Sequence, residues 1–311
     1  MKYVIVGDKK SVNKIPKSPN IEIKQAQTQY KTTLLAYRLP CFPENYRGIT
    51  WGVQKQSVKY TRYKGLVGNK FKYVYIYEVG CFNRNIYKSV CINKLLGNSP
   101  VRPKDEAVDR FLKMNINHYK SDTPKNTKGS YILVCAQVPT DTQVQHINYN
   151  AWIYETVKTL LGKNYKVLYR KHPKYNTSLI KELENHENLI MDSNTLEKSI
   201  SNAYVVVAFN SNCLLDAILQ GVPIFAFDNT SSVYDLANHT FDTLDAPYFP
   251  SYEVRLQTFA NIAYTQWTDE EIRNGKHFEY YENLITCYEN SLPKAEDCTK
   301  TNYSIKMQHL G

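Results

Sequence analysis

The 311-residue sequence contains only 12 glycines, and it has no apolar run close to the roughly 18 residues that a membrane helix needs. So little glycine excludes collagen-like and glycine-rich low-complexity chains. The apolar run at Tyr3–Val6 is too short for the core of a signal peptide and predicts a first strand. Because 42% of the residues are hydrophobic and 22% are charged, disorder is also excluded. We expect a cytoplasmic globular protein without stable membrane insertion.

Paired cysteines and acidic metal motifs are missing as well. The seven cysteines are odd in number, widely spaced and never arranged as Cys-x-x-Cys. They therefore support neither a disulfide framework nor a zinc site. No Asp-x-Asp occurs anywhere in the chain, which argues against a metal-bound diphosphate. The sequence predicts no metal site and no resident cofactor.

Positive charge is concentrated in the first half of the chain. Residues 1–130 carry 25 Lys and Arg against 8 Asp and Glu, a net charge of +17, whereas residues 131–311 carry 14 against 21, a net charge of −7. Such an asymmetry indicates two domains with different partners. Several of these cations alternate with aromatic residues, which offers phosphate contacts beside stacking surfaces. A polyanion such as duplex DNA is one expected partner, and a solvated basic face is the alternative. The candidate contact residues are Lys55, Lys59, Arg62, Lys64, Lys70, Lys72 and Arg84.

Strands and helices alternate along the second half. Hydrophobic runs bounded by turn residues predict the strands, and apolar residues at i, i+3 and i+4 spacing predict the helices. This alternation is typical of a parallel α/β sheet with helices on both faces. The expected strands are 131–136, 165–169, 189–191, 204–209 and 222–227, and the expected helices are 149–161, 179–185, 196–201 and 213–220.

The first half predicts shorter elements, separated from the second half by a polar linker at 120–130. Strands are expected at 3–6, 21–24, 48–52 and 73–77, and helices from 52 to about 66 and at 105–114. The segment from 268 to about 291 is predicted to be helical.

Polar residues follow three of the second-half strands, at the sheet edge where ligands of open α/β folds bind. Asn210 and Ser211 stand before a helix, where amide groups and side chains can bind an anion. Lys171 and His172 could neutralise a diphosphate, and Asp216 could accept a hydrogen bond from a ribose hydroxyl. Each feature alone has an ordinary structural explanation, such as a helix cap or a solvated helix residue. Their order and spacing carry the hypothesis.

The ordered set resembles the capsule-polysaccharide glycosyltransferases, a family that includes the Kdo transferases of bacterial capsule assembly. The matching pieces are a basic residue before His172-Pro173, a strand ending in Asn210-Ser211, an acid in the next helix, and Gly221-Val222-Pro223. Asp216 stands where the family usually has Glu, and Cys81 interrupts a Gly-Phe pair. The remaining pieces are Trp51-Gly52, residues 78–84, Gln137–Val144 and Gln266–Gly275, so the resemblance covers about residues 49–280.

The resemblance implies an α/β fold of the GT-B architecture, in which two Rossmann-like domains face each other across a cleft. The expected domains are a basic acceptor-binding domain at 1–125 and a nucleotide-sugar donor domain at 130–270. Residues 271–311 are expected to form a C-terminal helix and tail that pack back on the first domain.

The resemblance also implies transfer of a sugar from a UDP- or CMP-linked donor to a hydroxyl. Because no Asp-x-Asp occurs and basic groups cluster where a metal would sit, we expect this transfer to need no metal. The donor would contact Gln137, Lys171, His172, Asn210, Ser211 and Asp216. A carboxylate would act as the general base. Glu78 is the first candidate and Asp141 the second, although Glu78 could instead form a structural salt bridge with Arg84.

The acceptor is less determined than the reaction. Some phage enzymes glycosylate hydroxymethylated pyrimidines in DNA, and the basic first half makes this acceptor the preferred prediction, with the target base flipped out of the duplex. The enzyme would then work in the host cytoplasm. The alternative is a capsule or lipopolysaccharide glycosyltransferase that acts on a surface glycan or glycolipid. A further alternative is an inactive GT-B fold that binds nucleic acid.

Overall fold

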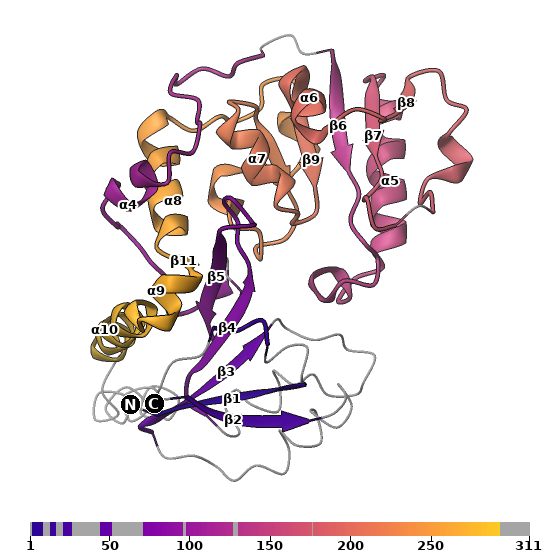
Figure 1. Cartoon of the computed structure of the whole chain (residues 1–311). Coiled ribbons are helices and arrows are strands. Elements are labelled where there is room, and N and C mark those ends of the chain that lie inside the picture. The colour runs from indigo at the N-terminus through magenta and orange to yellow at the C-terminus, as the bar shows by residue number, and fades with distance from the viewer. Residues whose placement is uncertain are drawn as a thin grey trace, which may run out of the picture.

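The computed structural model describes residues 2–8, 13–16, 21–26, 44–51, 71–95, 98–126, 130–175 and 177–292. These residues form two lobes, each built on its own sheet (Figure 1). The α/β architecture with two Rossmann-like domains facing across a cleft is thereby confirmed. Within the described residues, no helix is both long enough and apolar enough to cross a membrane.

The first lobe is built on a sheet of six strands in the order β11-β5-β4-β3-β1-β2. The four strands at the β2 side of the sheet are parallel, whereas β5 is antiparallel to β4 and β11 is antiparallel to β5. The strands are β1 (Lys2–Asp8), β2 (Ile21–Ala26), β3 (Tyr46–Trp51), β4 (Val74–Val79), β5 (Tyr87–Ile92) and β11 (Gln266–Thr268).

Two C-terminal helices cover this sheet, α9 (Asp269–Arg273) and α10 (Lys276–Ser291). Tyr75 is fully buried, so its hydroxyl needs a partner, and it donates to Glu282 of α10 at 2.9 Å. Arg47 on β3 also donates to Glu282, at 2.8 Å. Phe278 of α10 stacks on Tyr3 of β1, with ring centroids 3.7 Å apart. The C-terminal helix therefore belongs to the hydrophobic core of the first lobe.

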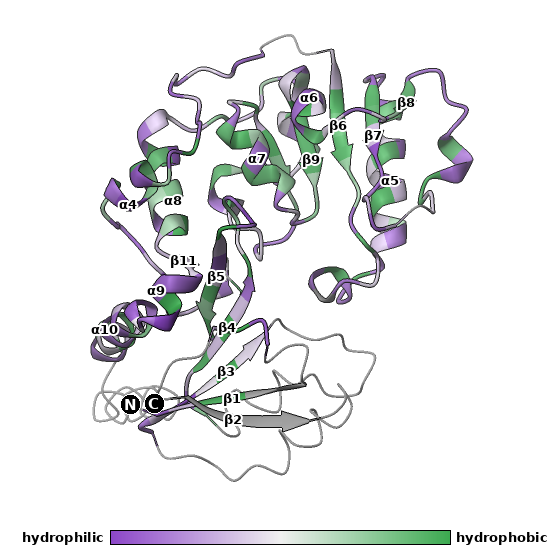
Figure 2. Cartoon of the chain, in the orientation of Figure 1, coloured by the Kyte–Doolittle hydropathy of each residue, from purple (hydrophilic) through white to green (hydrophobic). Residues whose placement is uncertain are grey.

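The second lobe contains a fully parallel sheet in the order β10-β9-β6-β7-β8. Side chains alternate between its two faces, as the period of a strand requires. On β6, Leu133 belongs to the core under helix α7 and Val134 to the core under helix α5. Figure 2 shows β6, β9 and α7 as hydrophobic. The elements are β6 (Tyr131–Cys135), α5 (Tyr149–Gly162), β7 (Val167–Arg170), β8 (Leu189–Met191), α6 (Leu196–Ser201), β9 (Ala203–Ala208), α7 (Cys213–Leu219) and β10 (Ile224–Ala226).

The chain returns to the first lobe through α8 (Tyr252–Ala263), which leads into β11 (Figure 1). Helix α4 (Asp109–Lys113) packs against α8, and Phe111 shares the second-lobe core. Phe82, at the tip of the β4–β5 hairpin, lies in the same core. The division at residues 125–130 stays a prediction, but these contacts show that residues before it pack on the second lobe.

Some predicted elements differ in length or kind. The helix predicted at 105–114 is the five-residue α4, and the one predicted at 179–185 is only a 3-10 turn at Lys181–Leu183. Strand β5 and helix α8 were not predicted. The helix expected between 52 and 66 lies outside the described residues.

Candidate functional site

A cleft cavity of about 460 Å³ lies between the lobes, within the roughly 300–1,000 Å³ that small-molecule sites occupy. One wall comes from the end of β4 and the β4–β5 hairpin, and the other from the loops after β6, β7, β9 and β10. Lys171 and Asp216 are not among its lining residues. The residues predicted from the sequence that do line it are Glu78, Arg84, Gln137, Asp141, His172, Asn210 and Ser211.

Gln137 and Asn210 are buried and bind each other. Gln137 Nε2 donates to Asn210 Oδ1 at 2.7 Å, and Asn210 N donates to Gln137 Oε1 at 3.1 Å. Asn210 Nδ2 also donates to Thr230 Oγ1 at 2.7 Å. These hydrogen bonds hold the loops after β6 and β9 together. Both residues also line the cavity, and their contact with a donor stays a prediction.

Asp228, which follows β10, extends this network and was not predicted from the sequence. Its Oδ1 accepts from Thr230 N at 2.8 Å and its Oδ2 lies 2.9 Å from His146 Nε2. Asn210 Nδ2 lies 3.4 Å from Asp228 Oδ1. One carboxylate therefore joins the loops after β6, β9 and β10. The available signal was its place at a strand end, the same signal that identified Asn210.

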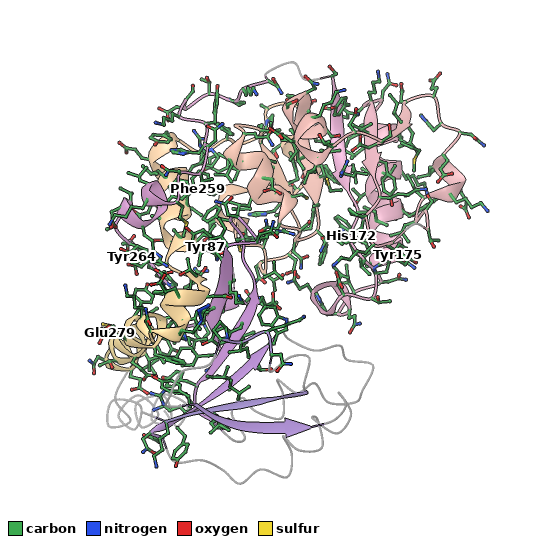
Figure 3. The ribbon with its side chains drawn as sticks, viewed as in Figure 1. Tyr87, His172, Tyr175, Phe259, Tyr264 and Glu279 are labelled. Carbon is green, nitrogen blue, oxygen red and sulfur yellow. The ribbon has the colours of Figure 1, made fainter. Side chains whose placement is uncertain are left out.

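His172 lines the cavity from the loop after β7, on the side of the second lobe that faces the first lobe (Figure 3). Its Nδ1 accepts a hydrogen bond from Lys174 N at 3.1 Å, which places the proton of the neutral ring on Nε2. Burial lowers the pKa of His172, the charges of Lys174 and Arg84 lower it further, and Asp141 partly opposes them. His172 is therefore a neutral hydrogen-bond donor at pH 7.

The residues after Asn210 connect the two lobes. Ser211 Oγ accepts from the N–H of Cys213, the first residue of α7, at 3.4 Å. Asn212 Nδ2 donates to the carbonyl oxygen of Cys81 at 3.2 Å, across the cleft. Cys81 N in turn donates to Gln266 Oε1 at 2.7 Å. The hydrogen bond from Asn212 thus joins the loop wall of the cavity to the hairpin wall, and Gln266 anchors the hairpin within the first lobe.

Three carboxylates were predicted to act at the site, and they differ in environment. Glu78 and Asp141 line the cavity, Glu78 from the first lobe and Asp141 from the second. Asp216 is mostly buried, and burial raises its pKa while the charge of Arg84 lowers it. Asp216 does not line the cavity, and its contact with a ribose hydroxyl stays a prediction.

Little of the predicted DNA surface can be placed. Lys55, Lys59, Arg62, Lys64 and Lys70 lie outside the described residues. Lys72 Nζ forms an ion pair with Glu289 of α10 at 2.7 Å. Arg84 lines the cleft. The two described members therefore do not form a common surface.

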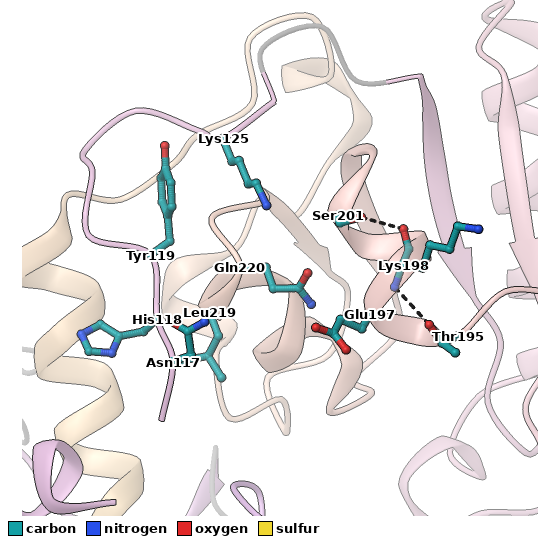
Figure 4. Close-up of a pocket in the computed structure, with 10 residues that line it drawn as sticks. All are labelled: Asn117, His118, Tyr119, Lys125, Thr195, Glu197, Lys198, Ser201, Leu219 and Gln220. Carbon is teal, nitrogen blue, oxygen red and sulfur yellow. Dashed lines mark hydrogen bonds between the residues drawn. The ribbon is translucent and has the colours of Figure 1, made fainter. Parts of the chain in front are cut away.

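A separate cavity of about 530 Å³ lies between residues 117–125 and α6 (Figure 4). Lys125 and Glu197 point into it from opposite sides, and Thr195 Oγ1 caps α6 by accepting from Lys198 N at 3.3 Å. None of the residues predicted to act on a donor lines this cavity. We therefore place the candidate site in the cleft. No group of three or more His, Cys, Asp or Glu among the described residues is arranged to hold a metal ion.

Comparison with family models and with curated protein sequences gives no match. Two solved structures from Thermosulfurimonas dismutans are similar in fold. The first, "KpsC, beta Kdo 2,7 transferase", is 16% identical with a TM-score of 0.55, over 90% of this chain and 98% of that one. The second, "KpsC, beta Kdo 2,4 transferase", is 13% identical with a TM-score of 0.53, over 91% and 97%. At this level of identity the comparison establishes a shared two-lobed fold.

Proposed function

We propose that this protein is a glycosyltransferase that moves a sugar from a UDP- or CMP-linked donor to a hydroxyl of a glycan acceptor. The observation that carries the proposal is the cleft cavity, which gathers a cation, a neutral histidine donor and carboxylates from two facing Rossmann-like lobes. Several of the sequence pieces that resemble capsule glycosyltransferases line this cavity, among them Glu78, Gln137, His172 and Asn210-Ser211, whereas Gly221-Val222-Pro223 and Gln266–Gly275 do not. The similar structures are titled Kdo transferases, which supports the same class of reaction.

The side chains present suit such a transfer. A new bond forms between the acceptor oxygen and the anomeric carbon, and the bond from that carbon to the phosphate oxygen breaks. Glu78, or Asp141 in its place, takes the proton of the acceptor hydroxyl. Arg84 and the Nε2–H of His172 stabilise the charge that develops on the leaving phosphate. In this proposal these two groups replace a metal ion.

A glycan acceptor now ranks above DNA. The fold comparisons point to enzymes titled as transferases of a sugar, and they lend nothing to DNA modification. The basic composition of residues 1–130 and the aromatic residues that alternate with its cations remain the observations that favour DNA. An inactive fold is less favoured, because the cleft retains two carboxylates beside a histidine donor.

The test is to incubate the purified full chain with a panel of UDP- and CMP-sugars and three acceptors: neutral oligosaccharides, acidic oligosaccharides and hydroxymethylcytosine-containing duplex DNA. Mass spectrometry of the products identifies the sugar and the acceptor. We expect transfer to an oligosaccharide, with Glu78→Gln inactive but still able to bind the donor. Transfer to DNA alone would restore the DNA prediction, and consumption of no nucleotide sugar would contradict the proposal.

A further inference from the structure

We propose that a second cavity, beside the cleft cavity and distinct from the one in Figure 4, binds the terminal sugars of the acceptor glycan. This inference rests on the proposed function. The second cavity has a volume of about 530 Å³ and lies between residues 98–105, the loop 229–235 and helix α8. Ser232 lines both cavities, while Thr230 lines the first and Ser231 the second. The two spaces therefore adjoin along one loop.

The lining of the second cavity suits a polyhydroxylated ligand. Hydroxyl and amide side chains dominate it, and its charged residues are two cations, Arg102 and Lys104, and two carboxylates, Asp105 and Asp235. Two cations and two carboxylates give the cavity no net positive charge that would attract a phosphate backbone, whereas sugar hydroxyls can pair with groups of either sign. The neutral polar residues are Asn98, Asn229, Ser231, Ser232, Tyr234, Thr258 and Asn261.

The first-lobe wall of this cavity is fixed at both ends. Ser99 Oγ lies 2.6 Å from the carbonyl oxygen of Ile92 and 2.7 Å from that of Val101. At the other end, Asn261 Oδ1 accepts from Glu106 N at 3.1 Å, and Gln257 Nε2 donates to Glu106 O at 2.9 Å. A wall that is already ordered loses little entropy when it binds a ligand.

The division of residues between the cavities assigns the substrates. His172, Arg84 and both candidate bases line the cleft cavity and none of them lines the second one. The nucleotide-sugar donor, whose phosphate is part of the leaving group, therefore binds in the cleft cavity. A two-substrate transfer needs a second binding space that opens on the reacting atoms. The second cavity provides that space, with the acceptor hydroxyl reaching the bases past Ser232.

Two substitutions on opposite walls can fill the second cavity. Thr258 on α8 donates its hydroxyl only to its own helix, to Val254 O at 3.1 Å, and Asn229 is exposed. Thr258→Trp and Asn229→Trp therefore add bulk without removing a core contact. Val254→Trp is the matched control, because Val254 is 47% exposed one turn away on α8 and does not line the cavity.

The measurement is binding of the full chain to an array of neutral and acidic oligosaccharides and to duplex DNA, with donor binding followed by calorimetry using UDP- and CMP-sugars. We expect Thr258→Trp and Asn229→Trp each to weaken oligosaccharide binding by about tenfold or more, with donor affinity and the Val254→Trp control unchanged. Three results would each overturn the assignment: unchanged oligosaccharide binding in both variants, a wild type that binds no oligosaccharide, or loss of donor affinity in the variants. If the two variants lost DNA binding but kept oligosaccharide binding, the assignment of a saccharide ligand to the second cavity would be overturned. Donor binding that fails in the wild type would instead count against the proposed function.

Discussion

Gln137 and Asn210 hold the loops after β6 and β9 together through two hydrogen bonds, of 2.7 and 3.1 Å. Because both side chains are buried, Asn210→Ala leaves Gln137 Nε2 without its acceptor, while the backbone N–H of residue 210 can still donate to Gln137 Oε1. We expect a loss of about 2 kcal/mol in the free energy of unfolding. Urea unfolding of the single variants and of Gln137→Ala/Asn210→Ala gives a double-mutant cycle. The double variant should lose clearly less than the sum of the two. Additive losses would show that the pair does not act as a unit.

The ring of His172 should titrate below its ordinary pKa of 6.5, because burial and two nearby cations disfavour its charged form. The unfolded chain then takes up this proton first, so the contribution of His172 to stability is lost as the pH falls from 6.5 to the folded pKa. NMR titration of the ring protons measures this pKa. Arg84→Met should raise it and Asp141→Asn should lower it. Shifts in the same direction in both variants would contradict the placement of these charges.

Asp216 should be a destabilising charge at neutral pH. Burial raises its pKa above the ordinary 3.8, so the unfolded chain releases the proton first and stability is lost as the pH rises through the folded pKa. Asp216→Asn should therefore be more stable than the wild type at pH 7, and the difference should shrink as the pH falls toward 3.8. Denaturant unfolding at several pH values measures it. A variant that is less stable at every pH would mean that the carboxylate has binding partners that the asparagine cannot replace.

Phe82 ties the hairpin of the first lobe to the core of the second. It is 2% exposed, and its ring centroid lies 5.5 Å from that of Phe111. We expect Phe82→Ala to lower the free energy of unfolding by about 3–5 kcal/mol. Ile86→Ala in the same hairpin is the control, because Ile86 is 55% exposed, and it should change stability by less than about 0.5 kcal/mol. Equal effects of the two substitutions on urea unfolding would contradict the docking of the hairpin.

Sequence patterns predicted the second lobe better than the first. Its strands are hydrophobic runs bounded by turn residues. Such continuous runs are typical of parallel strands that are buried on both faces. The same rule placed Asp141, His172 and Ser211 at strand ends, where the structure gathers them in one cavity. Such features depend on residues close in sequence, and local sequence patterns can therefore predict them.

Features that depend on distant residues could not be predicted. Nothing near Phe82 in the sequence indicates that it enters a core built mainly from residues after 110. The pairing of Asn210 with Gln137, 73 residues away, is likewise a contact that no local sequence pattern indicates. Arg255 is fully buried because the carbonyl oxygens of Tyr119 and Pro250 accept its hydrogen bonds, a set of partners that only the folded chain assembles. Such long-range contacts decide which polar residues remain available to a substrate.

The most direct test of the proposed function is calorimetric titration of the full chain and of His172→Ala with UDP- and CMP-linked sugars. We predict that the wild type binds one of these donors, and that His172→Ala binds it about tenfold or more weakly because the Nε2–H donor to phosphate is lost. Thr258→Trp, in the second cavity, should bind the donor as the wild type does. No binding of any nucleotide sugar by the wild type, or equal affinity of the wild type and His172→Ala, would contradict the assignment of the cleft as a donor site.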